Sequence, residues 1–233
     1  MQPSFSRRGA RRLLLLLALA LASAFAFAHG VADDDKAYFQ QSAGRNILPF
    51  IYLGAKHMVT GYDHLLFLFG VIFFLYRLKD VGAYVTLFAL GHSITLLSGV
   101  LSETHVNPYI VDAIIGFSVV YKALDNMGAL RRVLGFQPNT KAAVLVFGLF
   151  HGFGLATKLQ ELALSKDGLI PNIISFNVGV EIGQMLALSA ILIAMGYWRR
   201  SALFTRQAFN ANVVLMIAGF VLMGYQLTGY ATV

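Results

Sequence analysis

The residues Val81–Leu101 have the sequence VGAYVTLFALGHSITLLSGVL, and this stretch decides the class of fold. It contains no Asp, Glu, Lys or Arg, and it has about the 20 residues that an α-helix needs to cross a bilayer. The whole chain has a similar character, because 58% of its 233 residues are hydrophobic, 12% are charged and the mean hydropathy is +0.68. Soluble domains carry about 25% charged residues. The sequence therefore predicts an all-α, polytopic membrane helix bundle.

Five further apolar segments accompany this stretch, so we expect about six transmembrane helices in one domain, residues 47–233. The expected spans are Gly61–Tyr76, Val81–Leu101, Pro108–Leu124, Ala142–Leu162, Ile170–Trp198 and Ala208–Tyr230. The first span is short for a full crossing. The amphipathic segment Ile47–Thr60 before it either lies at the membrane interface or enters the membrane as the first half of a broken helix.

Residues 1–28 have the organisation of a cleaved export signal. Four arginines precede the apolar segment Leu13–Ala22, and Ala26-Phe27-Ala28 forms a small-x-small cleavage site. The alternative is an uncleaved first transmembrane helix. Cleavage would make His29 the N-terminus of an exposed outer segment, residues 29–46. Its imidazole and free amino group could then chelate a transition metal, although a simple solvated tail is the alternative.

The basic residues predict the orientation in the membrane. With the mature N-terminus outside, nine Lys and Arg residues fall inside and five outside, as the positive-inside rule requires. The inside set is Arg77, Lys79, Lys122, Arg131, Arg132, Lys141, Arg199, Arg200 and Arg206. The outside set is Lys36, Arg45, Lys56, Lys158 and Lys166. We therefore expect a multi-pass protein of the bacterial inner membrane with a periplasmic N-terminus, whose partner is the lipid bilayer and not nucleic acid.

Ionisable side chains inside the expected spans are the candidate functional residues, because each is unfavourable there by about 2.5–3.5 kcal/mol. The candidate metal ligands are His57, Asp63, His64, His92, His151 and Glu181, with Asp112, Asn177 and Gln184 as accessory residues. The chain has no cysteine, so a metal would be held by nitrogen and oxygen, which suit Ni²⁺, Co²⁺, Zn²⁺, Cu²⁺ or Fe²⁺. For any one of these candidate residues, the alternative is a structural role as a buried polar side chain that is hydrogen-bonded to a neighbouring helix.

Helix geometry restricts how the candidate residues combine. On an unbroken helix, His57 and His64 would face the same way but lie about 10 Å apart, which is too far for one ion. Either Gly61 breaks the helix and lets them converge, or the two imidazoles belong to an outer and an inner site along a path. Asn177, Glu181 and Gln184 share one helix face, because they are spaced i, i+4 and i+7.

Three motifs in combination resemble the HupE/UreJ family of hydrogenase- and urease-accessory membrane proteins. They are His57-x5-Asp63-His64-Leu65-Leu66-Phe67, Gly91-His92-Ser93-Ile94-Thr95-Leu96 and Phe150-His151-Gly152-Phe153-Gly154, with Glu181 downstream. The resemblance implies six helices, a cleaved signal peptide and a small permease for nickel or a related divalent metal. It also implies metal roles for His57, Asp63, His64, His151 and Glu181. Lys56-His57-Met58 and the position of Glu181 in the fifth expected span indicate the second branch of the family.

We therefore predict a secondary permease for a divalent transition metal, with nickel favoured and cobalt next, and not an enzyme. The chain has no Gly-x4-Gly-Lys-Ser/Thr motif, so energy would come from an ion gradient or from trapping inside the cell. Asp112 or Glu181 could carry a compensating proton. The alternatives are an intramembrane metalloenzyme with Glu181 as general acid or base, and an assembly factor that serves metalloenzyme maturation proteins. The sequence leaves open whether the chain acts as a monomer or a homo-oligomer.

Overall fold

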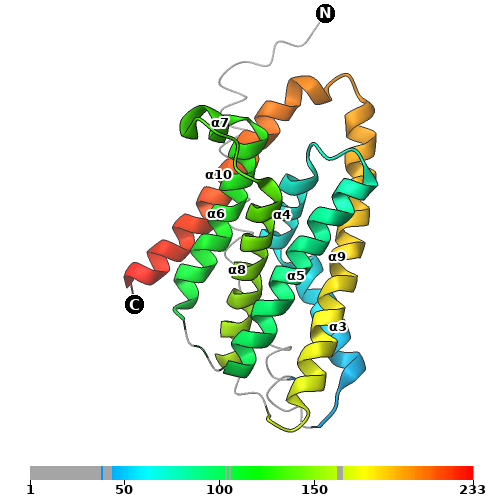
Figure 1. The fold of residues 1–233 in the computed structure, drawn as a ribbon, viewed down its shortest axis with the longest axis vertical. Coiled ribbons are helices and arrows are strands. Elements are labelled where there is room, and N and C mark those ends of the chain that lie inside the picture. The colour runs from blue at the N-terminus through cyan, green and yellow to red at the C-terminus, as the bar shows by residue number, and fades with distance from the viewer. Residues whose placement is uncertain (1–37, 39–43, 103, 105, 162–164, 233) are drawn as a thin grey trace, which may run out of the picture.

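The computed structural model describes residues 44–102, 106–161 and 165–232, together with Tyr38 and Thr104. The expected signal peptide, His29, Lys36 and most of the outer segment lie outside these residues. Within the described residues every element is an α-helix, which confirms the all-α fold (Figure 1). The elements are α3 (Ile47–Thr60), α4 (Tyr62–Ile72), α5 (Leu78–Ser102), α6 (Pro108–Asn126), α7 (Ala129–Leu134), α8 (Thr140–Glu161), α9 (Leu169–Arg200) and α10 (Phe204–Thr232).

Four helices are long and apolar enough to cross a membrane, namely α5, α8, α9 and α10. They make the chain a membrane helix bundle. Helix α4 is apolar but has only 11 residues, and α6 has 19 residues that include Asp112, Lys122 and Asp125. The remaining two expected crossings, by α3 with α4 and by α6, stay predictions.

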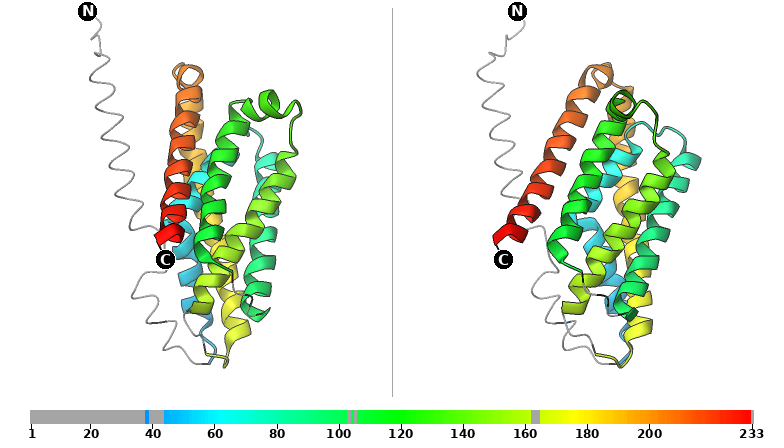
Figure 2. Two further views of the ribbon diagram at one scale, coloured as in Figure 1. Left: turned by 90° about the vertical axis from the view of Figure 1, so that its left-hand side faces the viewer. Right: turned by 60° about the vertical axis from the view of Figure 1, so that its left-hand side comes forward.

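The helices pack as three close pairs, which are α3 with α9, α5 with α8, and α6 with α10 (Figures 1 and 2). Glycine allows each close approach, because a helix backbone can come nearer where no side chain intervenes. Gly179 of α9 lies against the carbonyl of Ile51 in α3, and Gly152 of α8 lies against the carbonyl of His92 in α5. A Cβ atom at either position would collide with that carbonyl oxygen. The glycines therefore set the distance between paired helices.

The break expected at Gly61 separates α3 from α4. Gly61 has an extended backbone, with φ −73° and ψ 102°, and its N–H still bonds to the carbonyl of His57 at 2.9 Å. Helix α3 packs along α9 and buries Phe50, Leu53 and Met58. Ile47–Thr60 is thus the first half of a broken helix within the bundle, and not a segment that lies apart on its surface.

Helix α4 ends at Ile72, four residues before the expected end at Tyr76, and Arg199 explains where it stops. The guanidinium group of Arg199 donates hydrogen bonds to the carbonyls of Ile72, Phe73 and Leu75, the last two at 2.9 Å. The carbonyl of Ile72 also accepts from the N–H of Leu75 at 3.0 Å. A cation is favourable at a helix C-terminus. Arg199 therefore ties the end of α9 to the end of the half-helix α4.

The basic residues predicted to face the inside gather at one end of the bundle. This end contains the turns that follow α4, α6 and α9, together with the short helix α7 (Figure 1). All nine residues of the predicted inside set belong to these turns or to the helix ends beside them. The structure thus agrees with the expected alternation of the loops, while the side of the membrane that they face stays a prediction.

We predict that the close pair α3–α9 depends on Gly179. Gly179→Val should lower the midpoint of thermal unfolding by about 5 °C or more, because the new side chain would push apart two backbones. The matched control is Gly196→Val on the same helix, where a Cβ would have no neighbour within 4 Å. Thermal unfolding of the purified protein in detergent measures both, and equal shifts would contradict this role for Gly179.

Candidate metal centre

All four histidines of the described residues converge inside the bundle. His57 comes from the end of α3, His64 from the first turn of α4, His92 from α5 and His151 from α8. The ring centroid of His64 lies 5.2 Å from that of His57, 5.0 Å from that of His151 and 6.1 Å from that of His92. His64, His92 and His151 are at most 3% exposed. His64 is therefore the centre of a buried cluster of four imidazoles.

The break at Gly61 brings His57 and His64 together. The two residues are seven positions apart, and an unbroken helix would separate them by about 10 Å. The extended backbone of Gly61 turns α4 relative to α3, so that the rings meet edge to face. A Cβ atom on Gly61 would lie 2.7 Å from Nδ1 of His64 and 3.0 Å from Oδ1 of Asp63. Of the two arrangements expected for these histidines, convergence is the one observed.

Close packing of α5 against α8 places His92 and His151 in the same cluster. Gly148 and Gly152 lie against the carbonyls of Phe88 and His92, respectively. The hydroxyl of Thr95 donates a hydrogen bond to the carbonyl of Leu149 at 2.6 Å across the pair. The two histidines thus stand on facing helices whose spacing is fixed by backbone contacts.

Hydrogen bonds orient two of the imidazoles. Nδ1 of His64 lies 2.9 Å from Oδ1 of Asp63, and Nδ1 of His151 lies 2.7 Å from the carbonyl oxygen of Phe147. A carbonyl oxygen or a carboxylate can only accept, so each Nδ1 carries the proton and each Nε2 presents a lone pair. Metal-binding histidines are typically held in this way by a carboxylate or a backbone carbonyl. In this arrangement Asp63, predicted as a ligand, supports His64.

Five imidazole nitrogens of the cluster are buried and form no hydrogen bond with any described residue. They are Nε2 of His57, His64 and His151 and both ring nitrogens of His92. Most buried polar atoms in proteins have a partner, because burial without one is unfavourable. Several unpartnered imidazole nitrogens within one cluster are the kind of donor that a transition-metal ion requires. The residues present therefore fit such an ion.

The ring spacing indicates how the cluster would accept an ion. Two imidazoles on one tetrahedral ion, with metal–nitrogen distances of about 2.0–2.1 Å, have ring centroids roughly 5 Å apart. The contacts of His64 with His57 and His151 have this spacing, whereas His92 is about one ångström farther away. No three His, Asp or Glu side chains of the described residues are placed to hold a metal ion as they stand. A shared ion would therefore require the rings to reorient and His92 to move closer to His64.

Aromatic side chains that were not predicted from the sequence enclose part of the cluster. The ring centroid of His151 lies 5.4 Å from that of Phe67 and 5.0 Å from that of Phe88, and Phe67 contacts Phe147 at 5.9 Å. An apolar enclosure limits the access of water to a metal site. Helical spacing could have revealed it, because Phe88 and Phe147 each stand four residues before a cluster histidine and Phe67 stands three after one.

Asp112, an expected accessory residue, pairs with a lysine instead of joining the histidines. Its Oδ2 lies 2.9 Å from Nζ of Lys158, and its Oδ1 lies 3.1 Å away. Asp112 is buried, so this ion pair joins α6 to α8 beneath the surface. Lys158 was counted in the sequence only as an outer basic residue. Lys158 stands seven residues after His151, on the same face of α8, and this spacing could have indicated that its side chain points into the bundle.

Glu181, Asn177 and Gln184 share one face of α9, as predicted, and of the three it is Asn177 whose side chain lies beside the ring of His92. They line a groove of about 440 Å³ between α9 and α5. Asn177 donates a hydrogen bond to the hydroxyl of Ser93 at 2.7 Å, and Gln184 donates one to the carbonyl of Val85 at 3.4 Å. The side chain of Glu181 is exposed in this groove. The structure therefore separates the predicted glutamate ligand from the four histidines.

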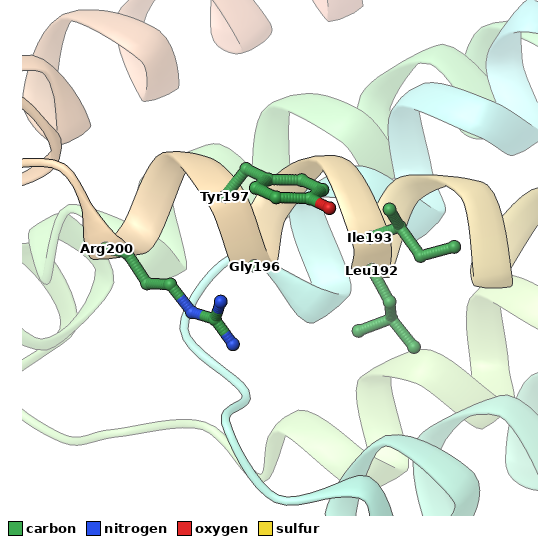
Figure 3. A pocket seen from close by; sticks show the side chains of 5 residues that line it. All are labelled: Leu192, Ile193, Gly196, Tyr197 and Arg200. Atoms are coloured by element: carbon green, nitrogen blue, oxygen red, sulfur yellow. The ribbon is translucent and has the colours of Figure 1, made fainter.

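A second hollow lies farther along α9, toward the basic end of the bundle. Figure 3 shows its lining residues, which are Leu192, Ile193, Gly196, Tyr197 and Arg200. All belong to one helix, and none of them is a histidine or a carboxylate. An exposed Tyr beside an Arg is typical of a helix end at a membrane interface. We assign this hollow to the outer surface of the bundle and not to the metal centre.

The architecture and the imidazole cluster together define a membrane helix bundle with a candidate intramembrane metal site. The family model for HupE / UreJ proteins matches residues 33–233, and the chain belongs to this family. No curated protein and no solved structure matches the chain. The resemblance stated from the three motifs is confirmed, and the branch within the family stays a prediction.

We predict that Asp63 raises the metal affinity of the cluster by orienting His64. Asp63→Asn should weaken binding of Ni²⁺ by about 10- to 100-fold, because a carboxylate that accepts from a ligand histidine increases its basicity. Asp167→Asn is the control, since Asp167 is an exposed carboxylate outside the cluster. Isothermal titration of both variants with Ni²⁺ measures the effect, and unchanged affinity in Asp63→Asn would contradict the assignment.

Proposed function

We propose that the chain is a secondary permease for a divalent transition metal, and that the four-histidine cluster is its binding site within the membrane. One observation carries the proposal: four imidazoles from α3, α4, α5 and α8 converge with buried nitrogens that have no other partner among the described residues. The HupE/UreJ family is associated with nickel or cobalt transport or with accessory functions, which supports this reading.

The donor set favours a late transition-metal ion, and the family association with nickel or cobalt narrows the choice to these two. Neutral imidazole nitrogens suit Ni²⁺, Co²⁺, Zn²⁺ and Cu²⁺, whereas Mg²⁺, Ca²⁺ and Mn²⁺ favour oxygen ligands. Asp63 supplies the only carboxylate in direct contact with the imidazoles among the described residues, and it offsets part of the ion's charge through His64. A cluster of four neutral rings and one carboxylate leaves net positive charge on a bound divalent ion. Such a site supports passage of the ion better than permanent retention.

The position of the cluster supports transport. Secondary transporters often bind their substrates where a membrane helix is broken near the middle of the bilayer. Here α4 begins at the break, and His57 belongs to the α3–α9 pair while His92 and His151 belong to the α5–α8 pair. A small shift of one pair relative to the other would change the distances between the ligands. The same permease would lie in the bacterial inner membrane, with its N-terminus in the periplasm.

Metal uptake into proteoliposomes tests the proposal. Wild type, His64→Ala and His151→Ala are compared in a mixture of Ni, Co, Zn, Cu, Mn and Fe, and metal in the lumen is measured by multi-element mass spectrometry. We expect wild type to accumulate nickel or cobalt. The initial rate of uptake should fall at least about tenfold in both variants, since each removes a ligand. His105→Ala, a histidine of the expected outer loop, should retain uptake.

Two other outcomes would change the assignment. If metal binds the protein at fixed stoichiometry and none enters the lumen, the chain is an assembly factor or an intramembrane metalloenzyme. If wild type accumulates metal and both histidine variants do so equally fast, transport occurs without the cluster.

A further inference from the structure

His92 is buried in the cluster, yet its own helix provides nothing that orients its ring. His64 and His151 are held by Asp63 and by the carbonyl of Phe147, each within four residues of the histidine that it orients. No residue of α5 bonds to either ring nitrogen of His92. A buried imidazole N–H without an acceptor is unfavourable. An acceptor for His92 must therefore come from another helix.

The side chain of Asn177 in α9 lies beside the ring of His92. Its Oδ1 atom is buried and bonds to no other described residue. An amide oxygen accepts hydrogen bonds and a neutral imidazole has one N–H to donate, so the two unused groups are complementary. Asn177 is thus placed to supply the acceptor that α5 lacks.

Ser93 determines which end of the Asn177 amide faces the imidazole. Nδ2 of Asn177 donates to the hydroxyl oxygen of Ser93 at 2.7 Å. An amide nitrogen can only donate, so this bond assigns Nδ2 to Ser93 and leaves Oδ1 for the ring. Ser93 follows His92 directly in α5, so one amide serves two successive residues of that helix.

We propose that Asn177 is a positioning residue of the metal centre. Its Oδ1 accepts from one ring nitrogen of His92, so that the other ring nitrogen presents its lone pair to the ion. Asn177 thereby does for His92 what Asp63 does for His64, but a neutral amide adds no charge to the site. This inference deepens the proposed function and rests on it, because it assigns His92 to the ion-binding cluster.

The position of Asn177 also joins the two packed pairs that supply the ligands. Helix α9 packs along α3, and its residue Phe176 contacts the ring of His57, with 6.1 Å between the ring centroids. Helix α5 packs along α8 and carries His92. A shift of one pair relative to the other would carry the acceptor away from His92. The orientation of this ligand therefore depends on how the pairs are placed.

Isothermal titration of the purified full-length protein with Ni²⁺ tests the role of Asn177. Asn177→Leu removes the acceptor and should weaken binding by about 10- to 100-fold, as the loss of a residue that orients a ligand does. Asn177→Asp keeps an acceptor and should bind Ni²⁺ at least as tightly as wild type. Gln184→Leu is the matched control and should bind as wild type does, because Gln184 also bonds to α5 from this face of α9, but at the carbonyl of Val85.

A double-mutant cycle shows whether Asn177 acts through His92. In the His92→Ala background, Asn177→Leu should cause no further loss of Ni²⁺ affinity, since the ring that it orients is gone. Three results would overturn the positioning role. They are unchanged affinity in Asn177→Leu, an equal loss in Gln184→Leu, and an undiminished effect of Asn177→Leu in the His92→Ala background.

Nitrogen-15 NMR of the metal-free protein, labelled at histidine, provides a readout without metal. The signals of His92 are assigned as those missing from His92→Ala. We expect a single tautomer of His92 in wild type and in Asn177→Asp, and a mixture of tautomers in Asn177→Leu, because the acceptor selects the protonated nitrogen. Identical His92 signals in wild type and Asn177→Leu would contradict the proposal. If wild type binds no Ni²⁺, the proposed function fails, and this comparison still decides whether Asn177 orients His92.

Discussion

The extended backbone of Gly61 is the constraint on which the candidate site depends. It divides a segment long enough to cross a membrane into two half-helices and turns the second so that His64 meets His57. The start of α4 then lies within the bundle, where Asp63 accepts from both the backbone N–H and the ring of His64. Arg199 holds the other end of the same half-helix. A short, fixed helix thus presents the central ligand of the cluster.

Glycine contacts supply the second part of the architecture. Gly152 and Gly179 place the backbones of α8 and α9 directly against their partner helices, so each pair is a closely packed unit. The cluster takes His92 and His151 from one pair and His57 from another, with His64 from α4. The imidazoles consequently sit where packed units meet, and that is a position where a small relative movement changes ligand geometry.

Much of this site could be predicted from the sequence. Ionisable residues are unfavourable inside apolar spans, so their presence there indicates a functional site. The four histidines could be named as candidates in this way, and a similar depth was expected for His64, His92, His151 and Glu181. Depth does not specify which helices are neighbours or which faces meet. Glu181 has a suitable depth, yet α9 turns it toward a groove beside α5, and Asp112 is held by Lys158. The sequence allowed either a helix break at Gly61 or an unbroken helix, and the structure shows the break.

X-ray absorption spectroscopy of the full-length protein loaded with nickel tests the central claim most directly. If the histidine cluster binds the ion, the spectrum will show a first shell of nitrogen at about 2.1 Å with outer-shell scattering from several imidazoles. The imidazole contribution will fall in His64→Ala. A first shell of oxygen without imidazole scattering would show that nickel binds elsewhere, and it would contradict the account.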